Sequence, residues 1–157
     1  FNVEQTPEAQ ADHFGGILAK QCVVCALIQG PDEDYARGEA LVRQMWAPVT
    51  KTYRITLEQM GLLEPALVET TTLTLINVMK QATDEVIRLG VPAEAAREFV
   101  LGHIHVELAI VFGEIDAQVS DGARLAMERA EAQLMQSDWK KLLQPDNMME
   151  QVRAITG

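Results

Sequence analysis

Residues 62–79 read LLEPALVETTTLTLINVM, and on a helix the side chains of this stretch are apolar or threonine nearly all round. A surface helix carries a single apolar stripe, so a helix of this kind is buried centrally or at a dimer interface. Pro65 fits the first turn of such a helix, and Gly90 fits its end. We therefore expect one long helix from Pro65 to Leu89, roughly 25 residues and about 37 Å long at about 1.5 Å per residue.

The rest of the chain is rich in helix-forming residues such as alanine, leucine and glutamate. Thr6 followed by Pro7 is typical of a helix start, and Thr56 followed by Gln59 is a capping-box pattern. Only residues 49–55 have an extended pattern. Further helices are predicted over residues 7–29, 31–47, 92–113, 120–136 and 146–155. The sequence thus predicts an all-α fold, a helical bundle around the long central helix, in one domain that covers residues 1–157.

The chain is acidic, because 13 lysines and arginines against 23 aspartates and glutamates give a net charge of −10. An acidic surface repels nucleic-acid phosphates and anionic lipids, which disfavours nucleic-acid and membrane roles. No apolar run approaches the roughly 20 residues of a membrane span. Cys22 and Cys25 are too few for a disulfide framework, which favours the reducing cytoplasm. Because the chain begins with Phe1 and not with methionine, we expect a processed or excised part of a longer product.

Lys20 lies among apolar residues of the helix predicted over residues 7–29. Burial would disfavour its charged ammonium, and a neutral lysine can take a proton from a hydroxyl while hydride leaves the same carbon. The alternative is a lysine whose carbon stem covers apolar surface while its ammonium stays in water. The Cys22-x-x-Cys25 pair falls in the same predicted helix and is interpreted as two buried small apolar residues rather than a redox pair.

Glu64 and Glu69 flank the start of the long predicted helix. Residues five apart on an α-helix point about 140° away from each other, so the two do not form a paired-carboxylate unit. A carboxylate at position 69 of an otherwise apolar helix needs an ion-pair partner or a role in a site, and both interpretations stay open. Glu64 is interpreted as an acid near the helix terminus.

His103 and Glu107 are four residues apart, the spacing of one helical face, whereas His105 projects elsewhere. This spacing suits two ligands of one metal ion, or a histidine held by a carboxylate. A metal site would need further ligands, for which Glu69 or a cysteine are the obvious candidates. The other interpretations are a substrate-binding or acid/base histidine and a satisfied core histidine. Four cations could meet a substrate carboxylate or be solvated charges: Arg54, Arg124, Lys140 and Lys141.

The segment Gly16-Ile17-Leu18-Ala19-Lys20 resembles the Gly-x-x-x-Lys segment of the β-hydroxyacid dehydrogenase and 6-phosphogluconate dehydrogenase superfamily. The similarity extends over nearly the whole chain. It is to the C-terminal helical domain of phosphogluconate-dehydrogenase-like proteins, a group that includes the D-apionate oxidoisomerases. The stretches that carry it are residues 14–16, 20–21, 26–31, 62–65, 102–104, 106–110 and 120–123. That superfamily usually has asparagine four residues after the lysine, where this chain has Val24.

The resemblance implies a fold like the 6-phosphogluconate dehydrogenase C-terminal domain, with Lys20 as general acid/base. It also implies an N-terminal Rossmann domain, absent from this chain, that binds NAD or NADP. The sequence holds no Gly-x-Gly-x-x-Gly segment, so we expect no cofactor-binding residue here. No metal site is assigned.

We therefore expect the substrate-binding and dimerisation domain of a cytoplasmic NAD(P)-dependent oxidoreductase of carbohydrate metabolism. Its substrate would be a sugar acid or hydroxyacid, and the chain alone would form a homodimer without activity. The predicted catalytic residues are Lys20, Glu69 and His103, and the predicted substrate-binding residues are Glu64 and Glu107. The alternative is a free-standing, non-enzymatic helical dimer that binds a small ligand, or a metal through His103, Glu107 and Glu69.

Overall fold

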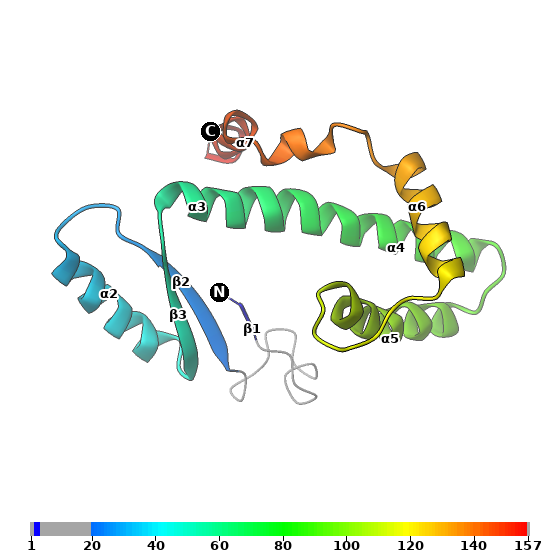
Figure 1. Cartoon of the computed structure of the whole chain (residues 1–157), viewed down its shortest axis with the longest axis horizontal. Helices are drawn as coiled ribbons and strands as arrows, with labels where there is room; N and C mark the ends of the chain where they lie inside the picture. The colour runs from blue at the N-terminus through cyan, green and yellow to red at the C-terminus, as the bar shows by residue number, and fades with distance from the viewer. Residues whose placement is uncertain (1, 4–19, 157) are drawn as a thin grey trace. The chain divides into compact units, whose positions relative to one another are not determined.

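The computed structural model describes residues 2–3 and 20–156. The chain divides into two compact units, Phe1–Pro65 and Ala66–Gly157. Each unit has its own arrangement of elements, and each is described by itself (Figure 1).

The first unit contains a three-stranded sheet in the order β1-β2-β3, formed by β1 (Asn2–Val3), β2 (Gln21–Ala26) and β3 (Val49–Ile55). β1 pairs antiparallel with β2, and β2 pairs parallel with β3. Parallel neighbours need a crossover connection, which α2 (Asp32–Met45) supplies by running back along the two strands (Figure 1). The extended pattern predicted for residues 49–55 is confirmed as β3.

The helix predicted over residues 7–29 is wrong at its C-terminal end, because residues 21–26 form β2. Residues 7–19 of that prediction lie outside the described residues. A short apolar run gives the same pattern in a buried strand and in a buried helix, and the β-branched pair Val23 and Val24 favours a strand. Pairing with β3 decides the outcome, and Val23 is buried. The chain is mainly helical, as expected, and it also contains one small three-stranded sheet.

The long helical stretch begins at Leu57, not at Pro65 as predicted. The Thr56 hydroxyl accepts a hydrogen bond from the Gln59 amide, and the Gln59 side chain accepts one from the Thr56 amide. This predicted capping box starts α3 (Leu57–Gly61), which continues directly into η1 (Leu62–Thr72) and α4 (Leu73–Arg88). The predicted end is confirmed by Gly90, whose φ of 109° suits glycine.

Pro65 lies inside η1, which is a π-helix. Its wider turn accommodates a residue that lacks an amide hydrogen and whose ring crowds the preceding turn of an α-helix. Two threonine side chains follow the same wide winding. The Thr71 hydroxyl donates to the Ala66 carbonyl at 2.9 Å, and the Thr72 hydroxyl donates to the Leu67 carbonyl at 2.8 Å.

The second unit continues with α5 (Ala93–Val111), α6 (Asp121–Leu134), η2 (Trp139–Leu143) and α7 (Pro145–Thr156). The predicted helices over residues 92–113, 120–136 and 146–155 are confirmed to within a few residues. The Ser120 hydroxyl caps α6 by accepting from the Ala123 amide at 3.2 Å. α4 and α5 run side by side in opposite directions as a helical hairpin (Figure 1).

Few side chains are buried within the chain. Among the described residues, the buried apolar positions are Val23, Ala66, Ala96 and Met148. On α4, the side chains of Leu73 and Ile76 remain 60% and 50% exposed. The predicted burial of this helix at the centre of a bundle is therefore not found within the chain. Exposed apolar surface on this scale is typical of a face that another protein surface covers.

Candidate functional site

Lys20 immediately precedes β2 and is exposed. The prediction that it lies on an apolar helix is wrong, and residues 20–156 do not bury its side chain. The residues Gly16 to Ala19, which carry the Gly-x-x-x-Lys resemblance, lie outside the described residues. Any desolvation of Lys20 must therefore come from a surface that covers this end of β2.

Glu64 and Glu69 both lie on η1 and are both exposed. In a π-helix the backbone hydrogen bond joins residues five apart. The five-residue spacing of Glu64 and Glu69 is therefore closer to one full turn here than it would be in an α-helix. The separation of about 140°, which assumed an α-helix, does not apply to this segment. Among the described residues, Glu69 has no ion-pair partner, and its exposure removes the need for one.

His103 lies in the middle of α5 and is exposed, so it is not a core histidine. Its Nδ1 is 2.9 Å from the backbone carbonyl oxygen of Phe99, one turn earlier on the same helix. The two aromatic rings lie 4.2 Å apart, centroid to centroid, with an angle of 31° between their planes. Glu107 is also exposed, and the hydrogen bond of His103 goes to the Phe99 carbonyl rather than to this carboxylate.

The candidate residues fall into two sets. Lys20 and Glu64 belong to the first compact unit, and Glu69, His103 and Glu107 belong to the second. No group of three or more histidine, cysteine, aspartate or glutamate side chains suited to a metal ion occurs among residues 2–3 and 20–156. The metal-binding alternative built on His103, Glu107 and Glu69 thus has no support from the described part of the chain.

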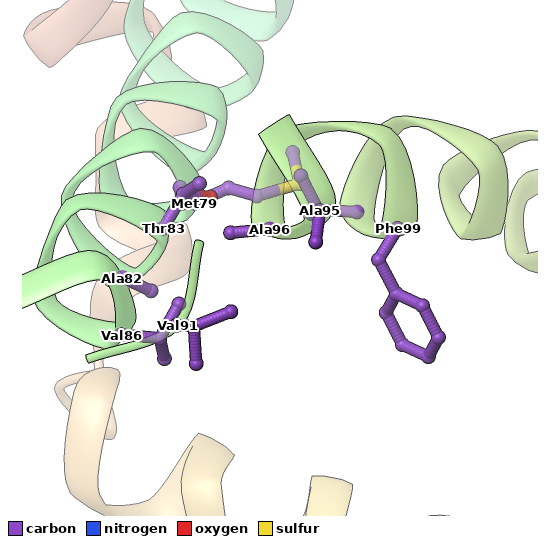
Figure 2. Close-up of a pocket in the computed structure, with 9 residues that line it drawn as sticks. Met79, Ala82, Thr83, Val86, Val91, Ala95, Ala96 and Phe99 are labelled. Atoms are coloured by element: carbon purple, nitrogen blue, oxygen red, sulfur yellow. Dashed lines mark hydrogen bonds between the residues drawn. The ribbon is translucent and has the colours of Figure 1, made fainter. Parts of the chain in front are cut away.

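The α4–α5 hairpin contains an apolar groove of about 450 Å³ (Figure 2). Small side chains such as Ala82, Ala95 and Ala96 leave space between the two helices, and the Phe99 ring stands at one side. The remaining lining residues are Met79, Thr83, Val86, Val91 and Val100. Sequence patterning missed this groove, because it depends on which small residues of two helices meet.

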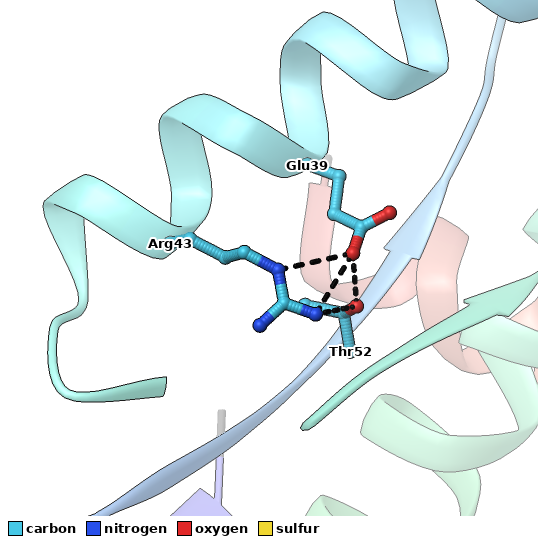
Figure 3. Close-up of polar contacts among 3 residues, drawn as sticks. All are labelled: Glu39, Arg43 and Thr52. Atoms are coloured by element: carbon cyan, nitrogen blue, oxygen red, sulfur yellow. Dashed lines mark hydrogen bonds and ion pairs between the residues drawn. The ribbon is translucent and has the colours of Figure 1, made fainter. Parts of the chain in front are cut away.

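A polar cluster in the first unit also escaped sequence reasoning (Figure 3). Glu39 on α2 accepts hydrogen bonds from Arg43 Nη2 at 2.9 Å and from Arg43 Nε at 3.1 Å, and it also accepts one from the Thr52 hydroxyl on β3. The hydrogen bond from Thr52, followed by that from Arg43, lowers the pKa of the Glu39 carboxyl. The four-residue spacing of Glu39 and Arg43 is a readable signal, whereas the contact with Thr52 is a tertiary one.

The other candidate cations are engaged within the chain. Arg54 Nη2 lies 2.5 Å from Asp32 Oδ1, and its guanidinium lies 4.4 Å from the centre of the Tyr35 ring. Two more of these four cations form ion pairs: Arg124 pairs with Asp121 at 2.6 Å, and Lys141 pairs with Asp138 at 3.0 Å. Lys140 Nζ lies 5.8 Å from the centre of the Trp139 ring. These contacts assign the four cations structural partners.

Cys22 and Cys25 are both free and half-buried on β2. Side chains three apart on a strand point to opposite faces, so the two thiols do not form one redox pair. Burial, followed by the nearby Glu39 carboxylate, raises the pKa of the Cys25 thiol. A protonated thiol is a weak nucleophile. The interpretation as small packing residues fits this environment, although the predicted helix around them is wrong.

The segment β2–α2–β3 has the strand–helix–strand connectivity that is found in Rossmann folds. Its charged side chains, however, do not suit a bound dinucleotide. Such folds hold the pyrophosphate at a glycine-rich turn and a helix N-terminus. The first turn of α2 carries Asp32, Glu33 and Asp34, which repel phosphate. A Cβ at Gly30 would come within 2.5 Å of Asp34 Oδ2, so this carboxylate occupies the space beside the turn. The charge at this turn is therefore unfavourable for a dinucleotide phosphate.

Comparison with known proteins places the fold. A solved structure of a semialdehyde dehydrogenase NAD-binding protein from Cupriavidus necator, in complex with calcium and NAD, is 46% identical to this chain. The match has a TM-score of 0.90 and covers 99% of this chain and 56% of that protein. The chain therefore has the fold of a domain from a dehydrogenase-type protein.

The chain belongs to the family of phosphogluconate dehydrogenase (decarboxylating) C-terminal domains, whose family model matches residues 2–156. This membership confirms the expected fold. The chain is also 46% identical over 156 residues to the D-apionate oxidoisomerases of Cupriavidus necator and Rhizobium rhizogenes. It spans about half the length of these curated relatives, 56% and 57% respectively. No helix among the described residues is long and apolar enough to span a membrane.

Proposed function

We propose that this chain is the substrate-binding and dimerisation domain of an NAD(P)-dependent oxidoreductase that acts on a sugar acid or hydroxyacid. The observation that carries the proposal is the 46% identity, over 99% of the chain, to proteins named D-apionate oxidoisomerase. Identity at this level over both compact units favours a shared substrate class. The reaction that we propose is an oxidation coupled to isomerisation. The enzyme that catalyses it would be a cytoplasmic homodimer.

Lys20 accepts the proton of the substrate hydroxyl in this proposal. A lysine can do so only in its neutral form, which needs a desolvated surrounding. Lys20 is exposed among the described residues, and in this proposal the nucleotide-binding domain or a second copy of the chain covers it. Glu69 and His103 orient the reacting part of the substrate. Glu64 and Glu107 accept hydrogen bonds from its remaining hydroxyl groups.

The nicotinamide cofactor is bound by a separate Rossmann domain in this proposal. Three observations support this division of labour. The sequence has no Gly-x-Gly-x-x-Gly segment. The acids at the start of α2 oppose a pyrophosphate. The relatives are longer by nearly the length of such a domain.

The test uses the complete protein, including its nucleotide-binding domain, with D-apionate as the first substrate and NAD or NADP as oxidant. We expect reduced nicotinamide to appear, and Lys20→Met to lower kcat by about 10²–10⁴-fold, the range for loss of a general acid/base. Lys51→Met is the matched control, because Lys51 is an exposed lysine on β3. A Lys20→Met enzyme that turns over as fast as the control would show that Lys20 is not the base.

The 157-residue chain by itself should neither bind the cofactor tightly nor catalyse oxidation. Titration of NADH into the chain, followed by nicotinamide fluorescence, should show no saturation in the micromolar range. Micromolar binding would contradict the proposed division between the two domains.

A further inference from the structure

Two contacts hold the imidazole of His103, and both come from Phe99. The Phe99 carbonyl oxygen lies 2.9 Å from Nδ1, and the Phe99 ring lies against the imidazole with a centroid distance of 4.2 Å. The first contact fixes one ring nitrogen and the second restricts the plane of the ring. A side chain that is exposed and yet held in this way is oriented before any ligand arrives.

The identity of the partner atom determines where the proton of the imidazole lies. A backbone carbonyl oxygen can only accept a hydrogen bond, so Nδ1 must be the donor. A neutral imidazole carries one ring proton, and the other nitrogen then keeps its lone pair. In His103 this second nitrogen is Nε2, on the side of the ring away from the Phe99 carbonyl.

We propose that α5 presents His103 as a preset acceptor, with Nδ1 protonated and the lone pair of Nε2 directed at a hydroxyl group of the ligand. Phe99 is the positioning residue that sets both the tautomer and the ring plane. The ligand class, a polyhydroxylated acid, rests on the proposed function, whereas the tautomer rests on the contacts with Phe99 alone. A hydroxyl donor suits this nitrogen, and a ligand group without a hydrogen does not.

Nitrogen-15 NMR of the complete protein, labelled at histidine and held at a pH where the imidazoles are neutral, tests the tautomer. Long-range coupling between ring carbon protons and ring nitrogens identifies which nitrogen carries the proton. We expect His103 to be protonated at Nδ1 and His105, two residues further along α5, to favour the Nε2 proton of a solvated imidazole. His13→Gln and His105→Gln assign the signals. A proton on Nε2 of His103, or a mixture equal to that of His105, would overturn the inference.

Phe99→Leu tests the positioning role, because it keeps the backbone carbonyl but removes the aromatic ring. We expect the population of the Nδ1-protonated form to fall at least several-fold relative to the other tautomer, and Phe99→Tyr to restore it. Phe112→Leu is the matched control, since Phe112 is exposed at the C-terminal cap of α5. An equal effect of Phe99→Leu and Phe112→Leu on the His103 tautomer would refute the role of the Phe99 ring.

Kinetics of the complete enzyme link the tautomer to the ligand. The glutamine amide in His103→Gln reaches the position of Nε2, whereas the shorter asparagine amide in His103→Asn reaches only that of Nδ1. We expect His103→Gln to keep KM within a few-fold and His103→Asn to raise it at least tenfold. Equal KM values for the two variants would refute an acceptor at Nε2. If the enzyme oxidises no sugar acid or hydroxyacid, the proposed function fails, while the NMR result still decides the tautomer.

Discussion

Glu39 is a carboxylate of the first unit whose pKa is lowered by hydrogen bonds. It accepts hydrogen bonds from Thr52 and Arg43, and these contacts lower its pKa from the ordinary value of 4.5. A carboxyl whose pKa is lower in the folded than in the unfolded state stabilises the fold at pH values above its unfolded pKa. That stabilisation is lost as the pH falls through the folded pKa. The hydrogen bond from Thr52 to the Glu39 carboxylate thus joins β3 to α2 most strongly at neutral pH.

Glu39→Gln should therefore lower the urea midpoint of unfolding at pH 7 and reduce the loss of stability between pH 5 and pH 3. Urea titrations followed by circular dichroism at these pH values measure both effects. Glu33→Gln, an exposed glutamate in the first turn of the same helix, is the control. A decline in stability with acid that is as steep in Glu39→Gln as in the control would be inconsistent with this role.

The capping box of α3 illustrates what a single helix end contributes at the scale of the element. Thr56 and Gln59 each satisfy an amide of the other, so two amides that lack helical partners are satisfied. These bonds also fix where the helical stretch begins, at Leu57.

Thr56→Ala should destabilise the protein by about 1 kcal/mol, within the range of about 0.5–2 kcal/mol for loss of an N-cap. Thr74→Ala is the comparison, because Thr74 is exposed within α4, where alanine is the better helix former. Urea unfolding gives the stabilities, and amide exchange at Gln59 reports the cap itself. The prediction fails if Thr56→Ala costs no more than Thr74→Ala.

At the scale of the whole molecule, apolar side chains of α4, α5 and α6 remain exposed. The groove between α4 and α5 is open as well (Figure 2). Soluble monomers rarely leave large contiguous apolar patches in water. We infer that a second copy of the chain covers part of this surface, in line with the dimer included in the proposed function.

Sedimentation equilibrium at micromolar concentration should give twice the chain mass of 17.4 kDa. The association should persist from 0.1 M to 1 M NaCl, because salt screens charges but does not weaken apolar contacts. A mass of 17.4 kDa at these concentrations would count against the dimer.

Sequence by itself determined the features that depend on neighbouring residues. The capping box at Thr56, the cap at Ser120 and the helix end at Gly90 all follow from local backbone hydrogen bonding, and the structure has each of them. The existence of α4 and α5 likewise follows from the helix-forming sequence and from the turn signals at Gly90 and Pro92. The family was also legible in the sequence, because its motifs are spread along nearly the whole chain.

Only the tertiary structure decided the features that depend on distant residues. Residues 21–26 are a strand because β3 supplies the partner for their backbone, and Lys20 consequently precedes a strand rather than lying on an apolar helix. The π-helical winding around Pro65 places Glu64 and Glu69 differently from an α-helix. The His103 tautomer depends on a side-chain rotamer that brings Nδ1 to the Phe99 carbonyl. A local sequence pattern indicates hydrogen bonds between residues that are close in the chain. Strand pairing and the orientation of the imidazole ring depend on groups that come together only when the chain folds.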